Sequence, residues 1–94
     1  MGRLILLNTA SAGTLESSDC LVTISPAEKL KLAYKGANSE VFAERTMALV
    51  ENVSKKYSLI GAEISIQDQG ALAITIKARL ETALMRAVKG VAKE

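Results

Sequence analysis

The sequence contains no histidine and a single cysteine among its 94 residues, and these two scarcities exclude most of the chemistry that a small protein performs alone. A serine or cysteine nucleophile needs a neighbouring base, which is most often histidine, so neither a Ser-His-Asp nor a Cys-His site can be built. Zinc, haem and iron–sulfur sites depend on histidine and cysteine ligands, and no DxDxDG calcium loop is present. We therefore expect no catalytic residue, no metal site and no enzyme activity of the chain alone.

Other scarcities narrow the range of partners and compartments. A lone cysteine cannot form an intramolecular disulfide, which is typical of proteins in the reducing cytoplasm. Aromatic residues make up 3% of the chain and the net charge is +2, which argues against a nucleic-acid partner. No window approaches the roughly 18 apolar residues of a membrane span, so we expect no membrane partner. The apolar run Leu4–Leu7 is too short for a signal-peptide core, and a short strand or packed arm explains it better.

What is present is the composition of a folded protein. Hydrophobic residues make up 49% and charged residues 23% of the chain. A chain of this size buries roughly 60–65% of its unfolded surface, which is enough for one core. Because no linker, repeat or low-complexity tract interrupts it, we expect a single domain over residues 1–94, with residues 1–11 as an N-terminal arm whose structure the pattern does not define.

The hydrophobic periodicity predicts an α+β fold. Apolar and polar residues alternate, or β-branched residues cluster, in four segments that we interpret as strands: 20–25, 29–35, 62–68 and 71–77. Apolar residues recur at helical spacing over 41–57 and 78–91. Short turns between neighbouring strands favour two hairpins. We expect a two-layer sandwich of order ββαββα, an antiparallel sheet with both helices on one face, and room for an extra N-terminal strand.

The second predicted helix has one apolar face and one basic face. We expect its apolar stripe to pack against the first hairpin, and this contact would join Leu80, Leu84 and Val88 to Leu30, Leu32 and Tyr34. The basic residues are expected to point into solvent: Arg79, Arg86, Lys89 and Lys93.

The segment AGTLESSDC, residues 12–20, places two serines between two carboxylates directly before the first strand. Gly13 frees the backbone, and serine and aspartate form turns by bonding their side chains to nearby amides. On composition alone this segment is a loop that binds its own backbone. Cys20 opens an apolar strand, and a cysteine in that position is most often a small core residue.

The same residues carry a resemblance to a known family. AGTLESSD (12–19) followed by an apolar strand is similar to the start of the citrate lyase gamma chain, which is the acyl carrier protein of that enzyme. DQGALAITIKARLETALMRA (68–87) is similar to the Gly-Ala-Leu turn, strand and Arg-Ala-Arg helix entry of the family. The resemblance spans about residues 12–87. Two features depart from it, since Lys77 stands where the family tends to have arginine and the apolar start is not typical of it.

The resemblance implies a site in this loop. It identifies Ser17 as the residue that carries 2′-(5″-triphosphoribosyl)-3′-dephospho-CoA through a phosphodiester, attached by a separate transferase. Ser18 fills a neighbouring position at which family members have glycine or serine. Glu16, Ser18 and Asp19 would be recognised by the transferase, or they would only shape the loop, and the sequence leaves both interpretations open.

The implied function is that of the acyl carrier subunit of citrate lyase. The thiol of the attached group would bear acetyl and citryl thioesters between the acyltransferase (alpha) and lyase (beta) subunits, so that citrate becomes acetate and oxaloacetate. An alternative in the same class is the carrier of a related complex such as citramalate lyase. An alternative from another class is a small, non-enzymatic α+β module that binds a ligand, a protein or RNA.

Overall fold

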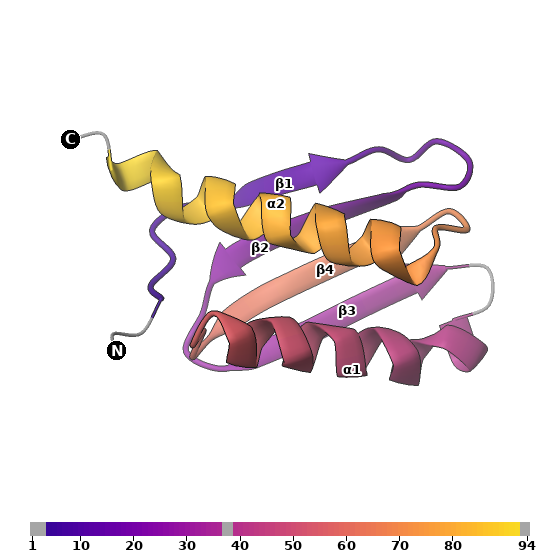
Figure 1. The fold of residues 1–94 in the computed structure, drawn as a ribbon, viewed down its shortest axis with the longest axis horizontal. Helices are drawn as coiled ribbons and strands as arrows, with labels where there is room; N and C mark the ends of the chain where they lie inside the picture. Colours follow the sequence, from indigo (N-terminus) through magenta and orange to yellow (C-terminus); the bar gives the residue numbers. More distant parts are fainter. Residues whose placement is uncertain (1–3, 37–38, 93–94) are drawn as a thin grey trace.

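The computed structural model describes residues 4–36 and 39–92. Within these residues four strands form one sheet, and two helices lie across one of its faces (Figure 1). Along the chain the elements are β1 (Ala10–Gly13), β2 (Cys20–Pro26), β3 (Leu30–Gly36), α1 (Ser39–Lys56), β4 (Ala62–Asp68) and α2 (Ala73–Ala92). The predicted two-layer α+β architecture is confirmed.

The sheet is mixed, so the prediction of a purely antiparallel sheet is wrong. Its strand order is β1-β2-β4-β3, in which β1 pairs with β2 and β2 with β4 in antiparallel fashion, while β3 and β4 are parallel. The predicted hairpin between β2 and β3 does not form, because β4 lies between these strands. Parallel neighbours need a crossover, and α1 provides it between β3 and β4.

A glycine makes this strand order sterically feasible. The short link from β2 to β3 passes the beginning of β4, where the amide of Ala62 donates a hydrogen bond to the carbonyl of Lys29 at 3.2 Å. A Cβ on Gly61 would lie 2.3 Å from the carbonyl oxygen of Ala27, well inside van der Waals contact. Only glycine therefore lets the link cross here without displacement of the backbone.

Residues 71–77, predicted as a strand, form instead the two residues that lead into α2 and the first part of that helix. The β-branched residues Ile74 and Ile76 favour a strand by propensity, but only Ile76 is buried, while Ile74 is 73% exposed. Ile76 extends the helical spacing of the apolar stripe by one turn, so that tertiary packing overrides local propensity. The fourth strand of the sheet is β1, the extra N-terminal strand that the sequence left room for.

The N-terminal arm packs against the ends of both layers. Leu4 forms an isolated parallel bridge with Leu59, and Leu6 is buried. The amide of Leu7 donates to the carbonyl of Ala87 in α2 at 3.4 Å. Leu4 and Leu6 therefore cover the edge of the core, whereas Ile5 and Leu7 are exposed.

The core lies between the sheet and the two helices. On the helix side, α2 contacts β1 and β2, while α1 contacts β3 (Figure 1). The α2 residues that close the core are Ile76, Leu80, Ala83, Leu84 and Ala87. The stripe is buried as predicted, but the prediction that it packs on the Leu30–Tyr34 face is wrong. Because β4 is inserted next to β2, β3 lies at the edge of the sheet and is covered by α1.

The solvent-facing positions follow the alternation of the strands. Lys31 and Lys35 are exposed on β3, which is an edge strand, and charged side chains there discourage pairing with another chain. Arg86 is exposed as predicted, whereas Lys93 and the side chain of Lys89 lie outside the described residues. Neither α1 nor α2, as far as they are described, has the length and apolar character that a membrane crossing requires.

The packing of α2 predicts a large cost for truncating its central leucine. Leu84 has no exposed surface, so Leu84→Ala should lower the free energy of unfolding by roughly 2–5 kcal/mol through lost burial and a residual cavity. Urea denaturation followed by circular dichroism measures this change. The matched control is Leu72→Ala, because Leu72 is 71% exposed and its truncation should change the same quantity by less than about 0.5 kcal/mol. Equal costs for the two variants would contradict this description of the core.

Candidate functional site

The two adjacent serines lie at the tip of the loop that joins β1 to β2. The amide of Asp19 donates to the carbonyl of Glu16 at 3.1 Å, which closes a β-turn with Ser17 and Ser18 at its centre. Ser18 has a φ of 68°, in the left-handed region, as the third residue of a type II turn requires. Both serines are exposed. The turn therefore presents Ser17 to solvent at the end of the hairpin.

A glycine lets the loop leave the hairpin. Gly13 ends β1 with a φ of 97°, and a Cβ there would lie 1.9 Å from the carbonyl oxygen of Cys20. The next amide, that of Thr14, donates to the same carbonyl at 3.2 Å. Any other residue at position 13 would push the two strands apart, so the loop geometry depends on this glycine.

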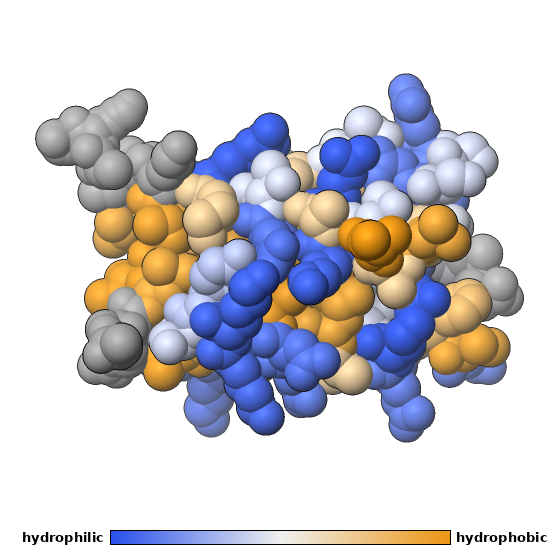
Figure 2. All heavy atoms as spheres, viewed as in Figure 1, coloured by the Kyte–Doolittle hydropathy of each residue, from blue (hydrophilic) through white to orange (hydrophobic). Residues whose placement is uncertain are grey.

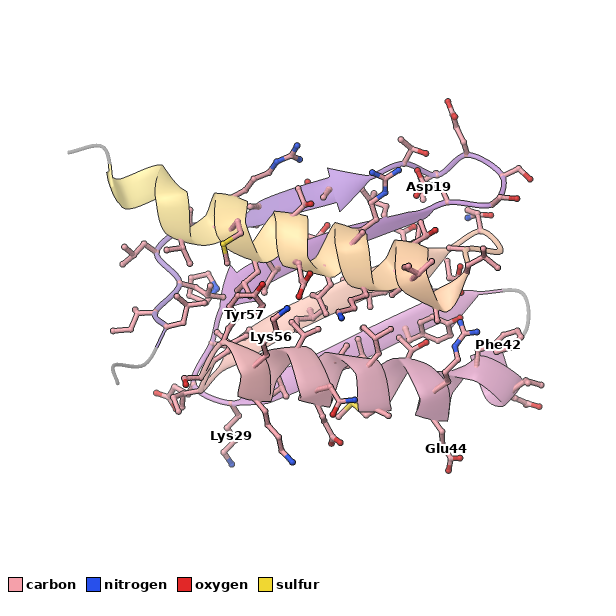
Figure 3. All side chains as sticks on the ribbon, in the orientation of Figure 1. Asp19, Lys29, Phe42, Glu44, Lys56 and Tyr57 are labelled. Carbon is pink, nitrogen blue, oxygen red and sulfur yellow. The ribbon has the colours of Figure 1, made fainter. Side chains whose placement is uncertain are left out.

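Asp19 is the centre of the hydrogen-bond network at the base of the loop (Figure 3). Its carboxylate accepts hydrogen bonds from the hydroxyl of Thr14 at 2.8 Å and from the amide of Cys20 at 2.7 Å. Arg79 of α2 binds this carboxylate in bidentate fashion: Nε donates to Oδ1 and Nη2 donates to Oδ2, each at 3.0 Å. These bonds, above all that from Arg79, hold the pKa of Asp19 well below its usual range and raise the pKa of Arg79.

This network corrects the expected position of Arg79 and bears on the role of Asp19. The sequence predicted Arg79 in solvent, but its guanidinium binds Asp19, which is 60 residues away in the sequence. A carboxylate so fully engaged inside the molecule shapes the loop, which is one of the two roles left open for Asp19. Glu16 is exposed beside Ser17 and has its carboxylate available to a partner.

The turn is also tied to the connection between β4 and α2. The amide of Ser18 donates to the carbonyl of Gln69 at 2.7 Å, and the amide of Gln69 donates to the carbonyl of Asp19 at 2.8 Å. These two bonds continue the β2–β4 ladder beyond the ends of the strands. The backbone on both sides of the tip is therefore held without any bond that requires the hydroxyl of Ser17.

A buried carboxylate fixes that second connection. Asp68, at the end of β4, accepts hydrogen bonds from the amides of Gly70 at 3.1 Å and Ala71 at 2.8 Å, and from the hydroxyl of Tyr34. Burial and this hydrogen bond raise the pKa of Tyr34. The predicted turn at residues 68–70 is therefore present, with Gly70 at a φ of 91°, but it leads into α2 rather than into a strand.

Comparison with known proteins places the chain in a family. A family model described as "Malonate decarboxylase delta subunit (MdcD)" matches residues 7–87. The citrate lyase acyl carrier protein of Treponema denticola is 46% identical over 78 residues, which cover 83% of this chain and 90% of that protein. The one from Halothermothrix orenii is 40% identical over 83 residues, with 87% and 88% coverage.

The chain belongs to the family of citrate lyase acyl carrier proteins and malonate decarboxylase delta subunits. It is accordingly a carrier subunit rather than an enzyme, and acyl carrier proteins of this family carry a prosthetic group. A chain of a Pseudomonas malonate decarboxylase hetero-tetramer, crystallised with malonate, has the same fold, with a TM-score of 0.77 at 22% identity over 92% of this chain and 90% of that one. The carrier role implies partner subunits.

The geometry of this carrier suits an attached group at the loop tip. A group joined to Ser17 would have its attachment point in solvent, because the side chain is exposed and the surrounding backbone is held by other residues. Cys20 is unsuited to that role, since it is fully buried and burial raises the pKa of its thiol to about 11. Its interpretation as a core residue is confirmed. Among the described residues no three histidine, cysteine, aspartate or glutamate side chains are grouped so as to hold a metal ion.

The lowered pKa of Asp19 predicts a pH-dependent contribution of this carboxylate to the stability of the carrier. A group whose pKa is lower in the folded state stabilises that state above its unfolded pKa, roughly 4 for aspartate, and loses this effect as the pH falls through the folded pKa. The loss of stability in Asp19→Asn, relative to the wild type, should therefore be largest near pH 7 and shrink progressively below about pH 4.

Urea denaturation of both proteins between pH 7 and pH 2 measures this difference. Glu16→Gln is the matched control, because its exposed carboxylate lies in the same loop but outside the network, and it should have little effect at any pH. A difference for Asp19→Asn that is the same at neutral and acidic pH would contradict an ionised, hydrogen-bonded Asp19.

Proposed function

We propose that this carrier is the acyl carrier subunit of a citrate lyase and that Ser17 is its attachment site. The group proposed is 2′-(5″-triphosphoribosyl)-3′-dephospho-CoA, joined to the serine hydroxyl through a phosphodiester. The observation that carries the assignment is the exposure of Ser17 at the tip of a turn whose backbone is held on both sides, by Asp19 and by Gln69. Identities of 35–46% to several citrate lyase acyl carrier proteins support the choice of complex.

The different backbone conformations of the two serines support the choice of Ser17. Ser18 occupies the left-handed position, where glycine is preferred, and its amide is bonded to Gln69. Its role is thus a backbone role, which agrees with the glycine or serine that the family resemblance implies there. Ser17 precedes it at a position with no such backbone demand, so its hydroxyl is the group that the turn presents.

In this proposal the chain holds the attached group in position and contributes no reactive side chain of its own. The attached group, when present, supplies a thiol on which the acyl substrate is carried as a thioester. The hairpin, braced by Asp19 and Arg79, provides the fixed base, and a tether on a fixed base raises the local concentration of the carried substrate at a partner site. The acyltransferase and lyase subunits would supply the catalytic residues that a chain without histidine lacks.

Attachment by a separate transferase, as the family resemblance implies, needs no histidine base in this chain. We assign its recognition to the tip of the turn, with Glu16 as the exposed charge beside Ser17. The single buried cysteine supports a reducing compartment, and we propose the cytoplasm.

A second candidate complex is a malonate decarboxylase. It is favoured by the family model that matches residues 7–87 and by the shared fold of the Pseudomonas hetero-tetramer chain. The two candidates differ in substrate, so purification of the intact complex from the native host and assay with citrate, malonate and citramalate decides between them. Turnover of citrate alone would support the citrate lyase assignment, and turnover of malonate or citramalate alone would overturn it.

The attachment site is tested by two alanine variants. Ser17→Ala should fold with a change in the free energy of unfolding within about 0.5 kcal/mol, because its side chain is exposed. When co-expressed with the transferase of the complex it should gain no mass, and the reconstituted complex should be inactive. Intact-mass spectrometry followed by peptide fragmentation locates the group.

Ser18→Ala is the matched control, one residue away in the same turn. It should keep most of the modification, and Ser18→Gly should keep all of it, because glycine adopts the left-handed conformation without strain. Recovery of the added mass on Ser18, or full activity of Ser17→Ala, would contradict the assignment of Ser17.

A further inference from the structure

A groove of about 350 Å³ lies between α1 and α2 on the helix side of the molecule. Leu49 and Val53 of α1 contribute apolar surface to it. Figure 2 shows apolar residues in the space between the helices, bordered by hydrophilic ones. The polar residues of the groove include three cations, Arg45 and Lys56 from α1 and Lys77 from α2.

A second cavity of about 260 Å³ adjoins this groove at Arg45, which lines both. Its other walls include Tyr34, Phe42 and Gly70. Gly70 directly follows Gln69, whose carbonyl holds the amide of Ser18. The two cavities together therefore lead from the connection that braces the serine turn to the space between the helices.

Arg45 is the residue in these cavities whose bonding is incomplete. Its guanidinium lies over the ring of Phe42, 4.4 Å from the ring centroid, and its Nε is buried with no hydrogen-bond partner among the described residues. A buried donor without a partner costs free energy, and native proteins avoid such groups. Because Nε is covered by protein atoms, a ligand with anionic oxygens would satisfy this donor only after a shift of the Arg45 side chain toward the groove.

The charges around the groove are mostly positive. Lys56 is paired with Glu81 of α2 at 3.0 Å, whereas Lys77 and Arg45 have no ion-pair partner within the described residues. Asp68 lines the second cavity, but its carboxylate already accepts three hydrogen bonds. Three cations against two engaged carboxylates, those of Glu81 and Asp68, make the groove attractive to an anion, although the whole chain carries a net charge of only +2.

We infer that this groove holds the phosphate-bearing part of the group attached to Ser17, with Arg45 and Lys77 binding phosphate oxygens above the apolar floor. The inference rests on the proposed function. Its basis is charge complementarity, because a phosphodiester-linked nucleotide is polyanionic and the second cavity, which adjoins the groove at Arg45, reaches Gly70 directly after the residue that braces the serine turn. Seating in the groove keeps the tethered group close to the carrier between visits to the partner subunits.

The groove can be tested without the attached group, with ADP as a free probe on the unmodified chain. NMR titration should show saturable shifts of the Arg45 Nε–H and the Asn52 side-chain amide, which lines the same groove. A dissociation constant of about 1 mM is sufficient, because a short tether supplies an effective concentration of that order. The affinity should fall as the salt concentration rises.

Two variants and one control make this titration specific. Arg45→Gln and Lys77→Gln should each weaken ADP binding by about tenfold, as measured from the shifts of the Asn52 side-chain amide. Because Lys77 is exposed, Lys77→Gln should not disturb the packing of the core. Lys31→Gln is the control, because it removes the same charge from the exposed side of the edge strand β3. The absence of saturable shifts, or equal affinities for the control and the groove variants, would overturn the inference.

Phosphorus NMR of the modified carrier separates this inference from the proposed function. The phosphorus resonances should be broader than those of free nucleotide and should sharpen in Arg45→Gln and Lys77→Gln, as the group becomes mobile. Resonances that are identical in the wild type and both variants would overturn the groove and leave Ser17 as the attachment site. A native-host protein with no phosphorus resonance would overturn the proposed function and, with it, the proposed occupant of the groove, and the ADP titration would then show only whether the groove binds a nucleotide.

Discussion

The bidentate ion pair between Asp19 and Arg79 is the interaction on which the presentation of the serine turn depends. It joins the loop of the first hairpin to α2, and α2 is fixed in turn because Leu80 and Leu84 are buried against the sheet. The position of the loop is thus determined by the core, although the loop itself lies at the surface. The same carboxylate also accepts hydrogen bonds from the hydroxyl of Thr14 and the amide of Cys20, so it holds both the loop and the start of β2.

This arrangement suits a protein that carries a substrate without transforming it. The residues that are usually reactive are withdrawn from solvent or engaged, as with the buried thiol of Cys20 and the hydrogen-bonded carboxylates of Asp19 and Asp68. The residue proposed to bear the group, Ser17, has the opposite environment, because its side chain is exposed and none of the hydrogen bonds that hold the turn uses its hydroxyl. Chemical inertness and defined geometry together let partner subunits control the reaction.

The same few residues link the serine turn to the interhelical groove. Asp68 organises the connection between β4 and α2, Gln69 holds the turn, and Gly70 lines the cavity that adjoins Arg45. A carrier needs its attached group to leave and return, and weak electrostatic attraction to a neighbouring basic groove is compatible with both. The proposed groove would therefore give the carrier a reversible binding site for the group, in addition to its attachment point.

Much of the local structure could be predicted from the sequence, because it depends on periodicity and on the chemistry of single residues. The alternation around Leu30–Tyr34 predicted β3, the helical spacing after residue 41 predicted α1, and the missing histidine excluded a Ser-His-Asp or Cys-His site. The serine turn was recognised from its composition and from the family resemblance. These features are encoded within windows of a few residues, where backbone geometry and side-chain propensity act directly.

Only the tertiary structure decided which elements pair with one another. The insertion of β4 between β2 and β3, the parallel pairing that follows from it and the helical state of residues 73–77 all arise from contacts between distant segments. Nothing next to Arg79 in the sequence indicates Asp19 as its partner, because that pair forms only when α2 crosses the hairpin. The sequence by itself thus determined most of the local elements and the lack of a histidine base. Packing determined the strand order, the bracing of the serine turn and the grouping of cations between the helices, because each requires burial or charge pairing across the fold.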